Sequence, residues 1–531
     1  MDERLYEIAP GAALPKGGAL EVGNKALTLM SLAAAGLPVP PAFVLPTHWC
    51  GRYRGKRAED AELRETLALG TAMLERATNL RFGSPRRPLL VSVRAGGTAS
   101  MPGMLETVLD IGMNQETVDG LIRLSGNPRL AWDSYRRLVQ GYAETVEGLP
   151  PGPFDELVAA AVSNADVQNE HELDHVGLRR LTQDMLTRFR DLAGTPFPQD
   201  PWQQMARAAA AVFRSWDAEK AATYRRLNGI DDGAGTAVTV QTMVFGNAGG
   251  ASGAGVGFTR NPATGERELY LDFQFNAQGQ DIVSGRQTTE THERLRRRLP
   301  RVWAQIETMG YALEALFRDA QDFEVTVQSG VLYVLQTRGA KRTPWAALRI
   351  AVDMVEEGLI SPQQALSSLT SVDAGSVVRT RVLPPRTPPL ARAQVASVGI
   401  ATGAIALDSD TAARMAQNGT PVILVRRETV TADINGMANA VGILTAFGGR
   451  TSHAAVVARQ LGKVCIVGCR GLAVDEDQQV CRIGGHTMNE GEILSLDGNT
   501  GDIYAGPLET VAERPERELT AIDAWRCATK A

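Results

Sequence analysis

The sequence has 531 residues, of which 44% are hydrophobic and 22% are charged, and its formal net charge is −5. This length predicts two or three domains, and the modest charge argues against a general affinity for nucleic acid or anionic membranes. No apolar run approaches the roughly 18 residues that cross a bilayer. The N-terminal residues lack the apolar core of a signal peptide. The 5 cysteines have no metal-type spacing and fit a reducing compartment, so we expect a cytoplasmic protein.

Near the N-terminus, a glycine turn precedes a helical run, Ala26 to Ala35, and a short apolar strand over 43–45. Lys25 lies beside this turn, where a lysine suits either a solvated helix start or a contact with phosphate. A further strand over 88–94 ends on Arg94, before a loop of small residues. An arginine at the end of a buried strand is costly unless it meets an anion. Arg94 is therefore expected either in an ion pair or on a phosphate.

The next part of the chain is predicted to be helical over about 114–197 and to form an insertion. Apolar periodicity favours the helices 116–124, 128–145, 154–162 and 178–192. His171 and His175 have the spacing of two metal ligands on a helix. Their flanks are acidic and lack the glutamate of a zinc protease, so we interpret both as surface residues. One more helix is predicted over 202–226.

A glycine-rich run, 246–257, follows a predicted strand over 236–245 and is expected to be a loop between two strands. Its backbone N–H groups could fold over phosphates. The run lacks the Lys-Ser/Thr and the helix that follow a Walker motif. A glycine loop between strands is instead typical of ATP-grasp domains, although glycine loops are common and the signal is weak by itself.

A hairpin is predicted over 322–338, with Asp322 and Glu324 on one face of its first strand and Gln336 and Arg338 on one face of its second. A two-residue turn at Ser329-Gly330 would point the two polar sets apart. A three-residue loop or a bulge would bring Glu324 opposite Gln336. In that register two carboxylates and an amide oxygen form a cluster suited to Mg²⁺, with Arg338 left for phosphate. The pattern alone does not decide between the registers.

The segment 344–390 begins as a helix and ends in a proline-rich run, which is expected to be a semi-rigid linker. Short β segments then alternate with glycines over 391–506 and predict a compact domain. The residues 507–531 form an expected tail. Because each part is expected to have its own core, a chain cut at about residue 343 is predicted to fold.

Within this last domain lies the stretch Gly448-Gly449-Arg450-Thr451-Ser452-His453-Ala454-Ala455-Val456-Val457-Ala458-Arg459. It follows a strand-like run, 440–446, and predicts a helix that ends at Gly462. Thr451 or Ser452 could cap the first turn, which leaves His453 at the positive end of the helix dipole. A phosphoryl group on the imidazole would be favoured there.

This stretch resembles the phosphohistidine motif of the pyruvate phosphate dikinase family of phosphoenolpyruvate-utilising enzymes. The resemblance runs from about residue 15 to 510 and implies an α/β and α+β multidomain protein. It implies an ATP-grasp domain with a helical insertion, about 1–343, followed after the linker by a swivelling β/β/α phosphohistidine domain. In the family, the histidine accepts phosphate from ATP and carries it to a second active site.

The resemblance also implies the site residues and the cofactors, ATP and Mg²⁺. His453, Arg338 and Arg94 are the expected catalytic residues, and Asp322, Glu324 and Gln336 the expected metal ligands. The expected nucleotide ligands are Lys25, Arg94, Ser252, Gly253, Gly255, Asp322, Glu324, Gln336 and Arg338. Thr451 matches a position at which plant relatives are switched off by phosphorylation.

The expected function is that of an ATP-dependent phosphotransferase that phosphorylates its own His453, releases AMP, and passes the terminal phosphate to inorganic phosphate or water. Two alternatives remain open. Arg450 is closer to enzyme I of the sugar phosphotransferase system, which suggests a phosphocarrier. Phe447 and Gln280 stand where arginine and glutamate are expected, which leaves room for a non-catalytic regulatory homologue.

The family's third part, a (β/α)₈ barrel that binds pyruvate or phosphoenolpyruvate, would begin where this sequence stops. We therefore expect the acceptor site to be supplied by another domain or protein. The expected partners are ATP, inorganic phosphate and this acceptor.

Overall fold

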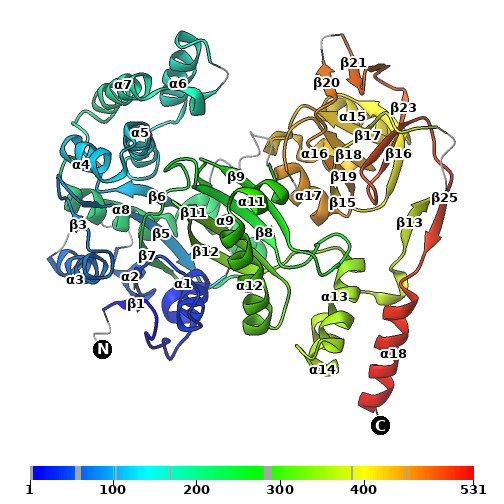
Figure 1. Ribbon diagram of the computed structural model, residues 1–531, viewed down its shortest axis with the longest axis horizontal. Helices are drawn as coiled ribbons and strands as arrows, with labels where there is room; N and C mark the ends of the chain where they lie inside the picture. Colours follow the sequence, from blue (N-terminus) through cyan, green and yellow to red (C-terminus); the bar gives the residue numbers. More distant parts are fainter. Residues whose placement is uncertain are drawn as a thin grey trace. The chain divides into compact units, whose positions relative to one another are not determined.

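The computed structural model describes residues 4–53, 61–99, 101, 105–167, 169–279, 290–383, 387–449, 452–476 and 478–530. These residues group into two compact units. The first comprises Met1–Gly249 with Tyr333–Thr337, and the second comprises Gly250–Leu332 with Arg338–Ala531. Both mix helices and strands, as expected (Figure 1).

The first unit contains a five-stranded antiparallel sheet with the order β1-β2-β7-β5-β6. Its strands are β1 (Tyr6–Ile8), β2 (Ala42–Leu45), β5 (Val91–Gly97), β6 (Thr107–Ile111) and β7 (Thr236–Thr242). The short strands β3 (Arg81–Phe82) and β4 (Pro88–Leu89) form a separate pair. The surrounding helices are α1 (Ala19–Ala34), α2 (His48–Tyr53), α3 (Ala61–Thr78), α8 (Pro201–Ser215) and α9 (Glu219–Asn228). Helices α1 and α8 pack on the central strands β5 and β7.

Helix α1 is kinked at Gly23, where the backbone adopts φ 75° and ψ 157°. A Cβ at this position would lie 2.1 Å from the carbonyl oxygen of Gly96 at the end of β5. Only glycine combines this conformation with such a close backbone approach. The Asn24 side chain also donates to the Thr98 carbonyl. The start of the helix is thereby fixed to the end of the central strand.

The predicted helical segment is confirmed. It contains α4 (Gln115–Ser125), α5 (Pro128–Thr145), α6 (Gly152–Asn164), the 3₁₀ turn η1 (Glu170–Glu172) and α7 (His175–Ala193). Asn114, Asn127 and Asp174 accept hydrogen bonds from first-turn amides at the N-termini. His171 and His175 lie in different elements, η1 and α7, and His175 is exposed.

The single helix predicted over 202–226 is wrong. The chain forms α8 and α9, separated at Trp216-Asp217-Ala218. The Trp216 ring is fully buried, its Nε1 donates to the Asp232 carbonyl at 3.1 Å, and the Arg225 guanidinium lies over it at 4.3 Å. Periodicity continued through this point, but the packing of one large ring redirects the chain.

The second sheet has the order β10-β9-β8-β11-β12. Its strands are β8 (Gly253–Phe258), β9 (Tyr270–Phe275), β10 (Glu290–Thr291), β11 (Gln321–Gln328) and β12 (Val331–Gly339), and the helices α11 (His292–Arg298) and α12 (Pro300–Phe317) precede β11. The prediction that 246–257 is one loop is therefore wrong, because its second half is strand β8. A Cβ at Gly253 would lie 2.4 Å from Phe273 Cζ, and one at Gly257 would lie 2.7 Å from Phe323 Cζ. These glycines make room for rings on the neighbouring strands.

The hairpin between β11 and β12 combines a two-residue turn with a bulge. Ser329 and Gly330 have φ 49° and 80°, as in a type I′ turn. At the open end, the Ala340 amide donates to the Ala320 carbonyl at 2.8 Å, which is one residue out of step with that turn. Along β12, burial alternates up to Val334 and changes phase across 335–336. An extra residue there explains both observations.

The domain that carries His453 is built on an eight-stranded sheet with the order β14-β24-β23-β16-β17-β18-β19-β15. The pairs β16–β17, β17–β18 and β18–β19 are parallel, and the other pairs in this sheet are antiparallel. The strands are β14 (Ala391–Arg392), β15 (Gln394–Ser397), β16 (Ile400–Ala406), β17 (Val422–Arg426), β18 (Gly442–Thr445), β19 (Val464–Val467), β23 (Ile493–Asp497) and β24 (Asp502–Ala505). The helices are α15 (Ser409–Gln417), α16 (Ile434–Asn439), preceded by η3 (Thr431–Asp433), and α17 (His453–Leu461). A small antiparallel sheet contains β20 (Leu472–Asp475), β21 (Val480–Ile483) and β22 (His486–Asn489).

The expected linker and the expected tail pack together. The elements are α13 (Pro344–Glu356), α14 (Pro362–Ser368), η2 (Ala374–Ser376), β13 (Arg379–Val382), β25 (Thr510–Glu513) and α18 (Glu516–Lys530). Strand β13 pairs with β25, and α18 contacts α13 and α14. The shared cluster also includes Phe258, Tyr270 and Ala320. Residues before and after position 343 therefore share one core. The expectation of separate cores, on which the predicted cut at about residue 343 depended, is wrong.

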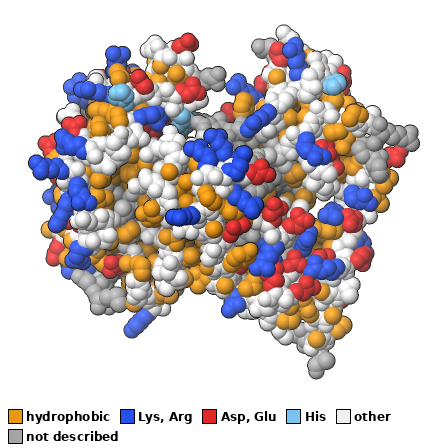
Figure 2. All heavy atoms as spheres, viewed as in Figure 1, with side chains coloured by type: hydrophobic (Ala, Val, Ile, Leu, Met, Phe, Trp, Pro, Cys, Tyr) orange, Lys and Arg blue, Asp and Glu red, His pale blue; other side chains and the backbone are white. Residues whose placement is uncertain are grey.

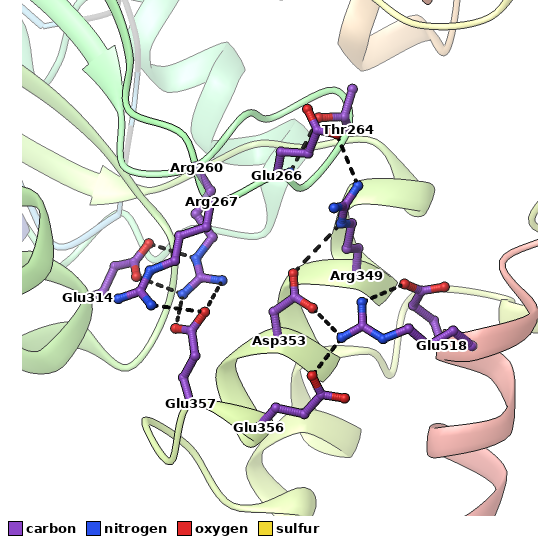
Figure 3. Close-up of polar contacts among 11 residues, drawn as sticks. Arg260, Thr264, Glu266, Arg267, Glu314, Arg349, Asp353, Glu356, Glu357 and Glu518 are labelled. Carbon is purple, nitrogen blue, oxygen red and sulfur yellow. Dashed lines mark hydrogen bonds and ion pairs between the residues drawn. The ribbon is translucent and has the colours of Figure 1, made fainter.

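Ion pairs reinforce this packing (Figure 3). Arg260 is fully buried and binds Glu314 of α12 at 2.9 Å and Glu357, just after α13, at 2.6 Å. Arg517 of α18 reaches Asp353 at 2.6 Å and Glu356 at 2.7 Å. Figure 2 shows acidic and basic side chains interspersed over this region. Burial of a charge requires such partners, so α13 and α18 are held at defined positions.

Candidate functional site

His453 lies at the first position of α17, in the strand–turn–helix arrangement that the sequence predicts. Strand β18 ends at Thr445, and the chain turns through Gly448, which has φ 102°. The helix ends at Gly462 with the left-handed values φ 65° and ψ 28°, as expected. Arg450 and Thr451 lie outside the described residues.

Of the two candidate caps, Ser452 does not cap the helix, and Thr451 lies outside the described residues. Ser452 occupies the N-cap position, but its side chain makes no capping hydrogen bond. The hydroxyl is buried, has no hydrogen-bond partner among the described residues, and lies under the turn, 2.9 Å from where a Cβ of Gly448 would be. The first amides of a helix lack intrahelical acceptors. Ser452 therefore does not compete with a ligand for the amides of α17.

Thr429 holds the imidazole of His453. Its Oγ1 lies 3.2 Å from His453 Nδ1. Thr429 follows β17, and His453 follows β18, which is the parallel neighbour of β17. Equivalent ends of parallel strands meet at one edge of the sheet, so the two side chains come together there. Sequence reasoning missed Thr429; a hydroxyl just after the neighbouring strand was the available signal.

Phe447 lies in the same turn, where the motif predicts arginine. Its amide donates to the Arg427 carbonyl at 2.9 Å. The Arg427 guanidinium carbon lies 5.2 Å from the centroid of the Phe447 ring, which is within the range of a cation–π contact. Phe447 keeps 36% of its surface exposed. A cation and an aromatic ring thus lie together at the edge that carries His453.

In the first unit, Lys25 and Arg94 lie on adjoining elements. Lys25 is exposed in α1, directly after the residues that bind the end of β5. Arg94 is partly buried in the middle of β5, which continues to Gly97 rather than ending at the arginine, and its Nε donates to Ser92 Oγ at 3.1 Å. Gln336, in β12, is half-buried.

In the second unit, Asp322 and Glu324 share one face of β11. Asp322 is 7% exposed, and its Oδ2 lies 2.7 Å from Arg338 Nε. Burial alone lowers the pKa of Arg338, but the Asp322 and Glu324 carboxylates outweigh it, so the net pKa is raised. The guanidinium therefore stays charged.

Of the expected residues in the glycine-rich run, Ser252 already has a structural partner. Its hydroxyl accepts a hydrogen bond from the Ser329 amide at 2.9 Å and so supports the hairpin turn. Gly253 and Gly255 are buried in β8. Their nucleotide contacts remain predictions, and packing gives both glycines an independent reason to be small.

The carboxylates of β11 are the candidate metal ligands. Two carboxylates on one strand face are hard donors of the kind that Mg²⁺ uses. Among the described residues, no group of three or more His, Cys, Asp or Glu could hold a metal ion, so any site here needs further oxygen donors. Gln280 lies outside the described residues. In the described part of the chain, no helix is both long enough and apolar enough to cross a membrane.

Comparisons with known proteins match both parts of the chain. Residues 58–303 match the family described as "Pyruvate phosphate dikinase, AMP/ATP-binding domain", and residues 419–501 match "PEP-utilising enzyme, mobile domain". A pyruvate, phosphate dikinase of Clostridium symbiosum is 40% identical over 510 residues, covering 95% of this chain and 58% of the relative.

Two further relatives show similar identity and coverage. A pyruvate, phosphate dikinase of Rhizobium meliloti (strain 1021) is 40% identical over 542 residues, covering 98% of this chain and 60% of the relative. A chloroplastic pyruvate, phosphate dikinase of Arabidopsis thaliana is 39% identical over 520 residues, covering 97% of this chain and 54% of the relative. The chain thus spans less than two thirds of the length of the relatives it matches.

Proposed function

Because the chain belongs to the pyruvate phosphate dikinase family, we propose that it is an ATP-dependent phosphotransferase that phosphorylates its own His453. The main observation behind the proposal is the position of the His453 imidazole. It lies at the start of α17, with Nδ1 beside the Thr429 hydroxyl. Both the helix amides and the dipole favour an anion there.

The contact between Thr429 and Nδ1 supports Nε2 as the nitrogen that reacts. When Nδ1 carries the proton and donates it to Thr429 Oγ1, the lone pair of the neutral ring lies on Nε2. Nε2 is then the nucleophile. The hydroxyl also stabilises the cationic ring that forms as Nε2 bonds to phosphorus.

The reaction proceeds in two steps. Nε2 attacks the β-phosphorus of ATP, the bond to the α-phosphate oxygen breaks, and AMP leaves while a pyrophosphoryl group remains on His453. Inorganic phosphate, or water, then takes the terminal phosphoryl group, and phosphohistidine remains. Phosphoryl transfer depends on positioning and positive charge more than on acid–base chemistry. Lys25, Arg94 and Arg338 are the residues proposed to supply that charge.

Asp322, Glu324 and Gln336 are proposed to hold Mg²⁺. The placement of Asp322 and Glu324 on one face of β11, where Arg338 meets Asp322, supports this set. Bound Mg²⁺ would neutralise phosphate charge and orient the nucleotide. Ser252, Gly253 and Gly255 are proposed to line the nucleotide with their backbone.

Residues 391–506 are proposed to swivel as a phosphohistidine carrier between the ATP-grasp-type domain, 1–343, and an acceptor. Strands β13 and β25 flank this segment in sequence and pair with each other, which supports a common hinge. The proposed acceptor is pyruvate, which the names of the relatives include, and it would be bound by another domain or protein. Thr451 is proposed as a regulatory position, because a phosphate beside His453 would repel the phosphates of ATP.

Incubation with MgATP tests the proposal. We expect acid-labile, alkali-stable phosphate on the peptide that contains His453. His453→Ala should lose it while still binding ATP, and His486→Ala, which changes an exposed histidine of β22, serves as the matched control. A wild-type protein that binds ATP without forming phosphohistidine would favour the non-catalytic alternative. Labelling by phosphoenolpyruvate but not by ATP would favour the enzyme I-like one.

A further inference from the structure

Arg427 and Phe447 form a cation–π pair in the turns that follow β17 and β18. At position 447 the motif predicts arginine, and this chain has phenylalanine in the turn that leads to His453. A cation that the motif places beside the phosphate acceptor is therefore absent from its expected position. The ring that replaces it carries the guanidinium of Arg427, 5.2 Å from its centroid.

Arg427 lies in the turn that follows the neighbouring strand, β17. It follows β17 directly, and its carbonyl accepts the Phe447 amide at 2.9 Å, so the backbones of the two turns are joined. Two residues later, Thr429 contacts His453 Nδ1 at 3.2 Å. The turns after β17 and β18 thus carry Thr429, which contacts His453, and the cation–π pair of Arg427 and Phe447.

Arg427 differs from its neighbour Arg426 in its partners. Arg426 binds Glu476 at 2.7 Å and lies 3.5 Å from Asp433, so its charge is used within the fold. Among the described residues, no carboxylate lies within ion-pair distance of Arg427, which is exposed. A guanidinium that stacks on a ring and has no acidic partner keeps its N–H donors for an anion.

We propose that Arg427, held over Phe447, is the phosphate-binding cation for the phosphoryl group on His453 and takes the place of an arginine at position 447. The inference rests on the proposed function of His453 as the phosphate acceptor. Phe447 is the positioning residue in this arrangement, because its ring sets the direction of the guanidinium. A phosphoryl group on Nε2 would then meet helix amides on one side and Arg427 on the other.

A charge exchange between the two positions tests this directly. The variants are Arg427→Gln, the double variant Arg427→Gln/Phe447→Arg, and Arg482→Gln. Arg482 is an exposed arginine of β21 and controls for a general loss of positive charge. All are compared with wild type for the rate of His453 phosphorylation by MgATP, after circular dichroism has verified folding.

We expect Arg427→Gln to slow the phosphorylation at least about tenfold, because it removes a donor to the transferred group. The double variant should recover most of the rate, and Arg482→Gln should leave it unchanged. An unaffected Arg427→Gln variant would overturn the inference. So would a folded double variant that remains as slow as the single one, because Phe447 would then not stand in for an arginine.

A second measurement does not depend on ATP. Phosphoramidate transfers its phosphoryl group to imidazole with loss of ammonia, and the signal of His453 is assigned in the ³¹P NMR spectrum by its absence in His453→Ala. A nearby cation favours the more highly charged phosphoryl form, so Arg427→Gln should raise the pKa of that group, by about 0.5 or more. An unchanged pKa would overturn the inference. Failure of ATP labelling in wild type, with this pKa effect present, would refute the proposed function alone.

Discussion

In the proposed reaction, the Thr429 hydroxyl accepts the proton of His453 Nδ1 and so keeps Nε2 free to react. Thr429→Val keeps the size of the side chain and removes the hydroxyl, so Nδ1 loses its acceptor. Because a neutral hydrogen bond contributes about 1 kcal/mol, we expect His453 phosphorylation to slow about fivefold. Thr429→Ser should restore the rate and the pH profile. Equal rates for the three proteins at every pH would show that Thr429 does not select the tautomer.

A second residue, Asp110, couples stability to pH. It lies in β6 with φ 59°, is fully buried, and has no hydrogen-bond partner for either carboxylate oxygen among the described residues. Burial raises its pKa to about 7; Arg137 opposes the shift, and Asp133 adds to it. Asp133 itself binds Arg136 at 2.8 Å and Arg137 at 3.0 Å. Asp110 is therefore protonated in the folded protein below neutral pH.

Because the pKa of Asp110 is raised in the folded protein, the contribution of this carboxyl to the free energy of unfolding falls as pH rises. The stability contributed by the neutral carboxyl is fully present below its unfolded pKa, 3.8, and is lost as pH rises through about 7. Asp110→Asn removes the titration and suits a positive φ. The free energy of unfolding of the variant minus that of wild type should therefore increase by about 2–4 kcal/mol from pH 4 to pH 8. Denaturant unfolding of the first unit measures this difference. A constant difference across that range would contradict the assignment.

At the scale of elements, the glycines of β8 have a packing role that is separable from phosphate binding. Gly253→Ala would place a Cβ 2.4 Å from Phe273 Cζ and 2.5 Å from the Gln274 carbonyl oxygen. Overpacking of this kind costs about 1–3 kcal/mol, so the unfolding midpoint should fall. Gly250→Ala, whose Cβ would come no closer than 3.6 Å to another group, is the control. A neutral Gly253→Ala would mean that β8 can shift away from β9.

The hairpin gives a prediction about the metal. Glu324→Ala removes one of the two carboxylates from the polar face of β11, so Mg²⁺-dependent nucleotide affinity should fall about tenfold or more. Titration calorimetry with and without Mg²⁺ measures this, and Glu268→Ala, an exposed carboxylate of the same unit, controls for net charge. Equal nucleotide affinity for wild type and Glu324→Ala in Mg²⁺ would exclude Glu324 as a ligand.

Local patterns predicted the elements that depend on neighbours along the chain. Helices α4, α5 and α7 have side-chain caps within their own sequence, and the helix at His453 ends at its own left-handed Gly462. Strand β8 was missed because glycine has low β propensity, and its reason for being there, Phe273, lies on another strand. Thr429 was missed for the same reason, because its role depends on the pairing of β17 with β18.

At the scale of the whole molecule, the cores could not be assigned from sequence. The proline-rich run suggested a spacer, yet α13, α14 and α18 share one cluster in which Ile522 is buried. Only the tertiary contact between segments more than a hundred residues apart reveals this. A proline run reports local stiffness, not what packs beside it.

Swivelling of 391–506 should be visible in solution. If the segment turns about β13 and β25, small-angle scattering should need more than one arrangement of the domains, and MgATP should shift their populations. His453→Ala, which removes phosphate transfer but not the hinge, should behave like wild type before nucleotide is added. One rigid envelope, the same with and without MgATP, would refute the carrier motion.

The proposed dikinase chemistry depends most on which phosphorus of ATP bonds to His453. Parallel incubations with Mg²⁺, phosphate and ATP labelled at either the β or the γ position decide it. We predict that the β label stays on the protein as phosphohistidine, that the γ label leaves in pyrophosphate, and that one AMP forms for each phosphohistidine. Retention of the γ label with formation of ADP would contradict the dikinase chemistry, even if His453 proved to be the residue modified.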